Sequence, residues 1–430
     1  MGAHAATEDP VKTKYESLEL FQKVLHFIET NYVDEVKTKT LLEGAIKGMM
    51  DTLDPHSNFL NAEVFKDMKA DTSGKFGGIG IEIGMKDNQL MVVSPMEDTP
   101  AWKAGVKTGD RIIRINGEST KGMNLVEAVS KMRGKKGSEI RLLIGRENGE
   151  KPRELKLVRA TIKVQSVKSE LLPDGFGYVR LASFNEDAAR DVKRAIEKLE
   201  KREKGGKLKG LVFDLRMNPG GLLDQAVDVA SLFMDEGVIV STIGRDRAQK
   251  ELKYARKGMA RKDLPLAVLV NAGSASASEI VAGALQDNKR AIILGQTTFG
   301  KGSVQQVVEL GNDLGMKLTI ARYYTPSGRS IQEKGVQPDI VLDDLDPKIL
   351  AQATRKTDSF RERDLKGHMT NPDGDGSSKD AKKDDADAKD DDEPLRFNPK
   401  EDYQVKQAVN YLKSFEFYQR IGKPLVANET

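Results

Sequence analysis

The chain contains no cysteine, only one tryptophan and only four histidines among its 430 residues. The absence of cysteine excludes disulfide bonds, thiol catalysis and cysteine-ligated metal sites. The histidines are His4, His26, His56 and His368, so the long stretch between Ser57 and Gly367 has none. A Ser-His-Asp triad is therefore not expected in that stretch. His56 follows a proline in a turn, where we expect a structural role rather than a catalytic one.

The sequence also lacks long apolar runs and an excess of one charge. No stretch approaches the roughly 18 consecutive apolar residues of a membrane-spanning helix. The net charge of +3 is a small difference between 69 basic and 66 acidic residues, which favours neither a nucleic-acid partner nor a membrane surface. With 38% hydrophobic residues the chain can bury a large core, and its length suits about three domains of roughly 150 residues each.

The beginning of the chain lacks the apolar segment of a signal peptide. Ala3-His4-Ala5 nevertheless has the A-x-A form found at signal cleavage sites. A chain that begins near a removed signal and one with an ordinary small-residue terminus both fit this pattern.

The region around Ser276 and Lys301 has the pattern of a βαβ unit. Apolar runs at 264–270 and 291–294 flank a helical pattern at 276–286, and a glycine-flanked lysine, Lys301, follows. The turn before the helix is built from glycine, alanine and serine. Such a turn lets a side chain and the first free amides of a helix face a ligand together.

A second strand–glycine–helix unit precedes the first. The apolar strand pattern 210–216 runs into Met217-Asn218-Pro219-Gly220-Gly221, and a helical pattern follows at 222–233. Strand patterns at 176–181 and 316–324 flank the two units, and a highly charged helix is expected at 187–204. Repeated βα units predict a parallel or mixed sheet covered by helices, hence an α/β fold.

Between 74 and 160 the sequence changes to short strands separated by glycine turns. A G-I-G loop at 78–80, the A-G-x-x-x-G-D segment at 104–110 and an I-N-G turn at 115–117 appear in this order. The order resembles a PDZ domain, which adds a peptide strand to its sheet edge and holds the peptide carboxylate on loop amides. The resemblance implies amides from Gly77 to Gly80 and a pocket lined by Ile79, Ile81, Leu125 and Val129. These four apolar residues also suit the domain's own core.

Amphipathic helices are predicted near both ends of the chain, at 15–32, 40–53 and around 405–415. Residues 370–395 are rich in Asp, Lys, Gly and Ser without periodicity, so we expect a disordered linker. An apolar helix after such a linker is expected to dock on a surface, for which a second subunit is one candidate.

Serines at the first turn and a lysine beyond the next strand suggest a nucleophile and its base. Lysine, with an ordinary pKa of about 10.4, becomes a base near neutral pH only where burial disfavours its charged form. Sequence physics alone does not distinguish Ser274, Ser276 and Ser278, each of which also suits helix capping.

Taken together with the PDZ pattern, four motifs resemble those of the carboxyl-terminal processing proteases over about residues 15–345. These are D-L-R-M-N-P-G-G, N-A-G-S-A-S-A-S-E-I, T-F-G-K-G-S-V-Q and Y-T-P-S-G-R. The resemblance implies Ser276 as nucleophile, Lys301 as base and Gln305 as the residue that orients it, with Gln306 adjacent. Backbone amides of Gly220 or Gly221 and of Ala277 would form the oxyanion hole.

The same resemblance implies a serine endopeptidase that binds substrate C-terminal tails on its PDZ domain and processes or degrades bacterial envelope proteins. Loop amides including Gly78 and Gly80 would hold the tail, and Arg133 would sense its binding; a surface turn charge is the other interpretation of Arg133. The core would be related to the ClpP/crotonase type. The resemblance further implies a periplasmic location, oligomers formed through the terminal helices and, in some relatives, a helper lipoprotein. No metal or other cofactor is expected.

We therefore divide the chain into an N-terminal helical region (1–73), a PDZ domain (74–160), an α/β serine protease core (161–345) and a C-terminal region (346–430). Two other functions fit parts of the sequence. A catalytically silent PDZ adaptor is disfavoured because it would not need Ser276, Lys301 and Gln305. An acyl-CoA enzyme on a crotonase-like core is disfavoured by the PDZ domain and the Ser/Lys pair.

Overall fold

The computed structural model describes residues 10–86, 89–146, 151–343, 361–364, 367–369 and 398–421. The expected linker at 370–395 and the A-x-A segment at the start lie outside these residues. Within the described ranges no helix combines the length and the apolarity that a membrane crossing requires.

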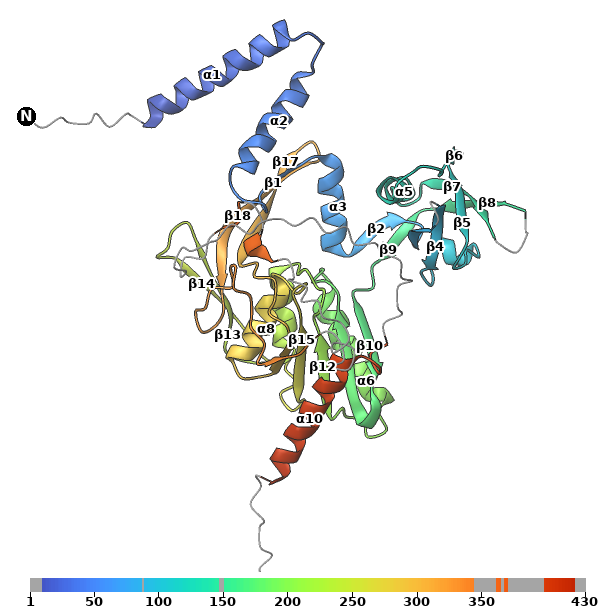
Figure 1. Ribbon diagram of the computed structural model, residues 1–430, viewed down its shortest axis with the longest axis vertical. Coiled ribbons are helices and arrows are strands. Elements are labelled where there is room, and N and C mark those ends of the chain that lie inside the picture. Colours follow the sequence, from blue (N-terminus) through green and yellow to red (C-terminus); the bar gives the residue numbers. More distant parts are fainter. Residues whose placement is uncertain are drawn as a thin grey trace, which may run out of the picture.

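A central six-stranded sheet carries the two predicted βα units. Its order is β10–β11–β12–β15–β16–β19, with β10 antiparallel to β11 and the other neighbours parallel. The sheet is therefore mixed, and the expected α/β class is confirmed (Figure 1). The strands are β10 (Val167–Leu171), β11 (Phe176–Leu181), β12 (Gly210–Asp214), β15 (Leu266–Val270), β16 (Ile292–Gly295) and β19 (Ile340–Val341).

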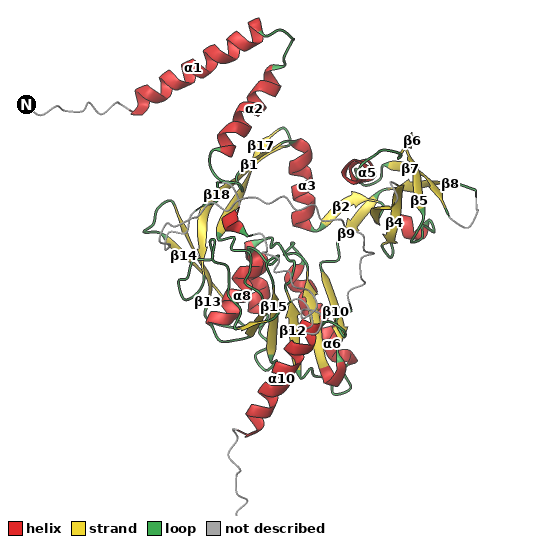
Figure 2. Cartoon of the chain, in the orientation of Figure 1, coloured by secondary structure: helices red, strands yellow, loops and turns green. Residues whose placement is uncertain are grey.

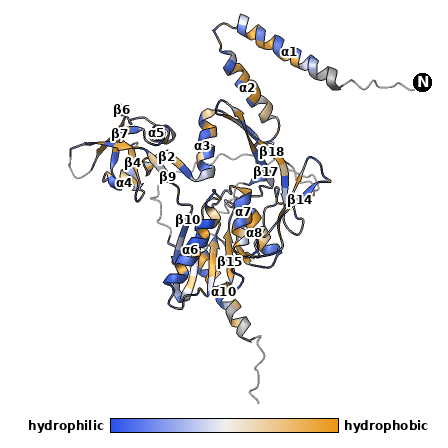
Figure 3. Cartoon of the chain, turned by 180° about the vertical axis from the view of Figure 1, so that it is seen from behind, coloured by the Kyte–Doolittle hydropathy of each residue, from blue (hydrophilic) through white to orange (hydrophobic). Residues whose placement is uncertain are grey.

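Helices cover both faces of this sheet, which explains its uninterrupted apolar strands. Helices α6 (Ala188–Arg202), α7 (Leu223–Ser231) and α8 (Ala277–Asp287) share one core with Val268 and Val270 of β15. The alternate residues of β15 contribute instead to a second core, on the face where α10 (Tyr403–Ile421) packs. Because neighbouring residues of a strand point to opposite faces, a strand covered on both sides is apolar throughout. Figure 3 shows β15 and α8 coloured mostly hydrophobic and α6 largely hydrophilic.

Helices α6 and α10 bury part of their surface against the chain's own core. The charged helix α6 exposes a solvated face, but it also buries Val192, Ile196 and Leu199 against the sheet. Helix α10 does dock, and its first half does so on its own chain, where Val405 and Leu412 are buried. Phe415 and Phe417, farther along α10, remain exposed.

A second sheet stands beside the first. Of its strands, the sequence patterns predicted only the one at 316–324. Its order is β1–β18–β13–β14, with β17 paired to β18 as a long hairpin (Figure 2). The strands are β1 (Asn58–Leu60), β13 (Val238–Gly244), β14 (Lys250–Tyr254), β17 (Ser303–Gly311) and β18 (Leu314–Tyr324). Residues 298–302, here named the lysine loop, contain Lys301. Because β17 begins at the next residue, Ser303, this hairpin fixes where the lysine loop leaves the core.

The PDZ-like region is a separate unit with its own apolar core. Its sheet has the order β3–β4–β5–β7–β8, with β6 on β5. The incoming strand β2 (Lys75–Gly78) pairs antiparallel with the outgoing strand β9 (Ala160–Lys163), so the unit is an insertion joined to the rest by a two-stranded ribbon. Its remaining elements are β3 (Ile81–Lys86), β4 (Gln89–Pro95), α4 (Pro100–Lys103), β5 (Arg111–Ile115), β6 (Glu118–Ser119), α5 (Leu125–Met132), β7 (Glu139–Gly145) and β8 (Arg153–Val158).

The N-terminal helices α1 (Pro10–Asn31) and α2 (Thr38–Asp51) form an arm that stands away from the rest of the molecule (Figure 1). Apolar side chains on this arm, including Leu18, Phe21 and Phe27, are exposed. Helix α3 (Ala62–Ser73) then returns the chain to the ribbon, and short 3-10 turns occur at Pro173–Gly175 (η1) and Glu362–Asp364 (η2).

Candidate active site

Ser276 stands at the N-terminus of α8 in a strained backbone conformation. Its φ of 55° and ψ of −112° lie in a region that a residue with a Cβ rarely adopts. Such strain persists only where the surroundings impose it, and it is concentrated at functional turns. The side chain is nearly buried, at 7% exposure.

The two neighbouring serines are engaged by the backbone around them. The Ser274 hydroxyl donates to the Leu215 carbonyl at 2.8 Å, and the Ser278 hydroxyl donates to the Asn218 carbonyl at 2.9 Å. Both residues are completely buried. They tie α8 to the end of β12 and thereby hold the turn that contains Ser276.

The glycine turn after β12 lies directly against the Ser276 turn. A Cβ atom on Gly220 would come within 2.8 Å of the Ser276 Cβ and 3.0 Å of the Ala277 nitrogen. Gly220 and Gly221 have φ values of 103° and 143°, which glycine adopts without penalty. A side chain at Gly221 would meet the Phe184 carbonyl oxygen at 2.4 Å. Close approach and unusual dihedrals both therefore require glycine here.

The backbone amides at this junction differ in their partners. The Gly220 N–H donates to the Asn218 side-chain oxygen at 2.9 Å. The Ala277 N–H, in the first turn of α8, has no hydrogen-bond partner among the described residues. Amides at this end of a helix lack intrahelical acceptors and carry the positive end of the helix dipole. In this conformation Ala277 thus presents a free donor next to the Ser276 hydroxyl.

A buried ion-pair network supports the glycine turn from behind. The Arg216 guanidinium donates to both oxygens of Asp214, and on its other side to Asp402 and Gln404 at the start of α10. Tyr178 donates its hydroxyl to Asp214 at 2.7 Å. The Asp214 carboxylate, together with Asp402, raises the pKa of Arg216 although burial opposes this. These partners come from distant parts of the chain, and the sequence analysis did not find them.

The completely buried Glu279 joins the serine turn to the lysine loop. Its Oε2 accepts the Ser276 N–H at 2.7 Å and the Lys301 N–H at 2.9 Å. Its Oε1 accepts the Gly300 N–H at 2.7 Å and the hydroxyl of Thr298. Burial raises the pKa of Glu279 to about 7, while these four donors act in the opposite direction. The S-A-S-E motif indicates that Glu279 is an acidic residue in the first turn of a helix. It does not indicate that Glu279 joins the serine turn to the lysine loop.

The environment of Lys301 lowers the pKa of its amine. Burial is the largest cause, because it disfavours the charged form, and the nearby charge of Lys317 adds to it. The carboxylates of Glu362, Glu279 and Asp54 act in the opposite direction. No hydrogen bond joins Lys301 to Ser276 or to Gln305 within the described residues.

The two adjacent glutamines lie in different places. Gln305 is partly buried, and its amide donates to Ser303 at 2.8 Å and to Thr319 at 3.2 Å. Thr319 in turn donates to Asp54 at 3.2 Å. Gln306 is exposed on the other side of β17. Gln305 thus belongs to a polar chain that leads from β17 to the turn after α2.

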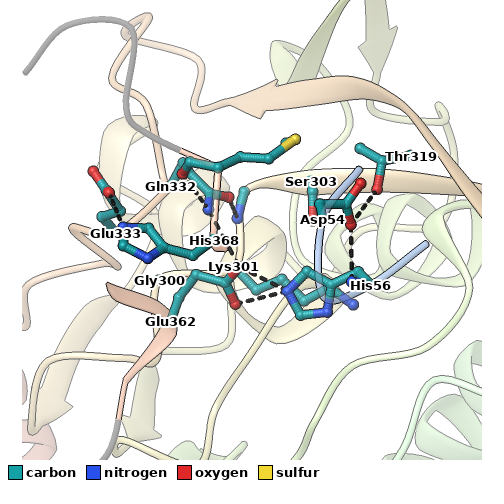
Figure 4. A network of polar contacts seen from close by, with 12 residues as sticks. Asp54, His56, Gly300, Lys301, Ser303, Thr319, Gln332, Glu333, Glu362 and His368 are labelled. Atoms are coloured by element: carbon teal, nitrogen blue, oxygen red, sulfur yellow. Dashed lines mark hydrogen bonds and ion pairs between the residues drawn. The ribbon is translucent and has the colours of Figure 1, made fainter. Parts of the chain in front are cut away.

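Two histidine–glutamate pairs hold a C-terminal segment over the lysine loop (Figure 4). His56 Nε2 lies 2.7 and 2.9 Å from the two oxygens of Glu362, and His368 Nε2 lies 2.6 Å from Glu333. Gln332 contacts both sides, accepting the Gly302 N–H and donating to Glu362. The stretch from Ser57 to Gly367, which contains Ser276 and Lys301, has no histidine of its own. The fold nevertheless brings His56 and His368, from either side of that stretch, close to the lysine loop.

The expected peptide-binding residues lie around β2, β3 and α5 of the PDZ-like unit. Gly78 pairs with Ala160 in the ribbon, and Ile79 is 2% exposed within the unit's core. The φ of Gly80 is 76°, and a side chain there would meet Thr99. The other three are more open: Ile81 and Val129 are partly buried, and Leu125 is exposed.

Arg133, at the end of α5, connects the PDZ-like unit to α3. Its guanidinium donates to Asp67 of α3 at 2.9 Å and lies 4.9 Å from the ring centre of Phe76 in the ribbon. It also lines a cavity of about 410 Å³ between α3, the ribbon and α5, together with Val129. No group of three or more His, Asp or Glu side chains in the described ranges is placed to hold a metal ion.

Sequence profiles of three known families match the chain. Peptidase family S41 matches residues 175–342, the PDZ domain matches residues 91–146, and the N-terminal domain of the activating protease CtpB matches residues 2–64. These matches fall on the mixed-sheet core, the inserted unit and the N-terminal arm.

Relatives match most of the chain. The carboxy-terminal-processing protease of Bartonella bacilliformis is 43% identical over 412 residues, which cover 96% of this chain and 92% of that protein. The carboxy-terminal processing protease CtpA of Bacillus subtilis is 40% identical over 319 residues, or 74% of this chain and 67% of that protein. Among solved structures, the photosystem II D1 C-terminal processing protease has 33% identity and a TM-score of 0.44, covering 76% of this chain and 92% of that one.

Proposed function

The chain belongs to the carboxy-terminal processing proteases of peptidase family S41, and we propose that it cleaves proteins with a Ser276–Lys301 dyad after binding their C-terminal tails on its PDZ domain. The observation that carries the dyad is the meeting of three loops. The Gly220 turn lies against Ser276, and Glu279 binds both the Ser276 turn and the Lys301 loop.

Ser276 is the nucleophile in this proposal. Ser274 and Ser278 donate their hydroxyls to backbone carbonyls inside the core, whereas Ser276 occupies the strained position at the helix N-terminus. A nucleophile on a tight strand-to-helix turn is exposed to a substrate carbonyl and lies beside free helix amides. The family resemblance selects the same serine.

Lys301 is the general base and acid. The neutral amine takes the Ser276 hydroxyl proton as the Ser276 oxygen bonds to the substrate carbonyl carbon. The resulting ammonium then returns this proton to the departing amine as the C–N bond breaks, which leaves an acyl-enzyme. A water molecule then attacks the ester carbon while Lys301 accepts its proton, and Lys301 returns that proton to the Ser276 oxygen as the ester C–O bond breaks and the carboxylic acid product leaves. The lowered pKa of Lys301 supports this role, because a base must be neutral before it acts.

The oxyanion would be held by the Ala277 amide and by an amide of the glycine turn. Gly221 is favoured over Gly220 in the present conformation, because the Gly220 N–H already donates to Asn218. Removing one preorganised donor of this kind costs on the order of 3–4 kcal/mol of transition-state stabilisation. Gln305 supports the site through Ser303 and Thr319 and turns toward Lys301 in the catalytic conformation.

The lack of a hydrogen bond between Lys301 and Ser276 fits an enzyme at rest. Catalytic contacts are often long before substrate binds. We propose that a tail bound near Ile81, Leu125 and Val129 moves the PDZ domain on its β2–β9 ribbon. Arg133, which joins α5 to α3, would transmit that movement to the core.

The exposed apolar helices and the family membership also bear on the assembly of the protein and its place in the cell. The exposed apolar side chains of α1 and α2 favour a homo-oligomer formed through the N-terminal arm, and the exposed end of α10 offers a second contact. Family membership favours a periplasmic enzyme that acts on envelope proteins, with a helper lipoprotein as a candidate activator.

Cleavage of casein, an unfolded model substrate, by wild type, Ser276→Ala and Lys301→Ala tests the dyad. Lys198→Ala serves as the control, because Lys198 is an exposed lysine on α6 that is not among the groups acting on Lys301. We expect cleavage by wild type and Lys198→Ala only, with binding of a C-terminal peptide retained in all four. Cleavage by Ser276→Ala would refute the choice of serine. Binding without cleavage in every variant, with or without added activator, would favour the adaptor.

A further inference from the structure

Residues 361–364 and 367–369, here named the strap, are fixed to the lysine loop, to Gln332 and Glu333, and to His56. The Glu362 N–H donates to the Phe299 carbonyl, and Gln332 donates to the Met369 carbonyl at 2.9 Å. Two side-chain pairs, His56–Glu362 and Glu333–His368, complete the attachment. Glu362 is completely buried, so its carboxylate needs these partners in place of water.

Three carboxylates act on Lys301, and two of them accept four hydrogen bonds each from other groups. Glu279 accepts two on each oxygen, from the serine turn and the lysine loop, so its roughly four acceptor positions are filled. Asp54 accepts three on Oδ1, from the His56 and Ser57 backbone and from Thr319, and one on Oδ2 from the Ser57 hydroxyl. These contacts hold Asp54 in the turn after α2 and leave one position on its Oδ2.

Glu362 is the carboxylate whose engagement depends mainly on one side chain. His56 lies within hydrogen-bond distance of both its oxygens, and Gln332 adds a longer contact of 3.3 Å to Oε1. Figure 4 shows dashed lines that join Glu362 directly to His56, with Lys301 drawn beside this pair and Asp54 on the His56 side. The remaining charged groups near these residues are Lys317 of β18 and Arg361 and Arg363, which flank Glu362 in the strap.

We propose that His56 is a positioning residue for Lys301, because it binds the Glu362 carboxylate and so keeps that carboxylate from pairing with the Lys301 ammonium. Without His56, the buried carboxylate keeps the longer Gln332 contact and loses a partner at both oxygens, which leaves it open to the Lys301 ammonium. The Lys301–Glu362 ion pair would then favour the charged amine and withdraw the base from Ser276. This inference rests on the proposed role of Lys301.

The sign of the effect follows from the need for a neutral base. Activity rises with pH as Lys301 loses its proton, so the acid limb of the kcat/KM profile reports its pKa. Removing His56 should move that limb to higher pH by about one unit, the lower end of what one nearby opposite charge produces. At a pH below the limb, a one-unit shift corresponds to about a tenfold loss of activity.

The experiment compares casein cleavage against pH for wild type, His56→Ala and His56→Ala/Glu362→Gln. We expect the limb to move upward in the single variant and to fall back to the wild-type position or below it in the double variant, because glutamine lacks the charge that raises the pKa of Lys301. His368→Ala is the matched control. It removes the other strap histidine, whose partner Glu333 is not among the groups acting on Lys301, and should leave the position of the limb unchanged.

A second readout does not require turnover. Cyanate carbamylates only neutral amines, so the pH dependence of Lys301 carbamylation, followed by peptide mass spectrometry, reports the same pKa in resting enzyme. We expect the same upward shift in His56→Ala and the same reversal in the double variant. Carbamylation of the exposed Lys198, which is not among the groups acting on Lys301, provides the internal reference.

The outcomes distinguish this inference from the proposed function. An equal loss of activity at all pH values, with an unchanged carbamylation profile, would mean that His56 is only structural and would overturn the inference while leaving the dyad intact. Full activity of Lys301→Ala, together with inactive His56→Ala, would make the histidine the base and overturn both. A shift that Glu362→Gln does not reverse would refute the part assigned to Glu362.

Discussion

Replacing Glu279 by glutamine tests how the two catalytic loops are held together. Each carboxylate oxygen accepts two hydrogen bonds, from Ser276 and Lys301 on one side and from Thr298 and Gly300 on the other. A glutamine amide keeps one acceptor oxygen and places an N–H₂ group where the other oxygen was. In either orientation two donors lose their acceptor and face another donor.

The magnitude follows from those two lost bonds. Hydrogen bonds to charged groups contribute about 1.5–3 kcal/mol each, so the free energy of unfolding should fall by about 3–6 kcal/mol. That is a large share of the 5–15 kcal/mol typical of a folded protein. Thr298→Val, which removes one of the four donors and keeps the carboxylate, should cost less and serves as the graded control.

Hydrogen exchange measured by mass spectrometry detects the loss of these hydrogen bonds directly. Peptides containing the Gly300 and Lys301 amides should exchange faster in Glu279→Gln, and casein cleavage should be lost even at temperatures where the variant remains folded. Thermal unfolding measures the stability change in parallel. Wild-type exchange at 298–302 together with wild-type cleavage would refute the bridging role of Glu279.

Three further predictions concern the glycine turn, its support and the PDZ connection. Gly220→Ala should abolish casein cleavage in a folded protein, because its Cβ would lie 2.8 Å from that of Ser276; cleavage near the wild-type rate would contradict the close approach. Asp402→Asn should lower kcat about tenfold with little change in KM, since it weakens the hold of α10 on Arg216 behind the turn; an effect on KM alone would contradict this support role. Arg133→Ala should uncouple peptide binding from cleavage, so that a C-terminal peptide still binds but no longer changes the cleavage rate; unchanged stimulation would assign Arg133 to the surface.

Much of the protease core was predictable because its signals are local. The apolar strand patterns ending at 216 and 270 and the helix patterns after them correspond to β12, α7, β15 and α8. A strand buried on both faces must be apolar throughout, so such runs are recognisable without a structure. The order of the PDZ motifs and of the four protease motifs likewise lies in the chain itself, and the family is confirmed.

The second sheet and the docking site of α10 were less predictable. Strands β14 and β17 are partly exposed and polar, so their patterns resemble loops until β13 and β18 supply their pairing partners. Strand β13 is apolar and largely buried, and the sequence analysis did not identify it. The docking site of α10 was also undetermined, because an amphipathic helix shows that it needs a partner surface but not which one. Tertiary structure assigned its first half to the chain's own sheet.

The sequence by itself determined the elements, the family and the short list of serines and lysines that could carry the chemistry. Only the tertiary structure decided their surroundings, because burial and hydrogen-bond partners arise between residues far apart in the chain. His56 and Glu362 are 306 positions apart and meet beside Lys301, and Arg216 reaches Asp402 across 186 positions. A pKa or a free amide depends on such neighbours, so these properties exist only once the chain has folded.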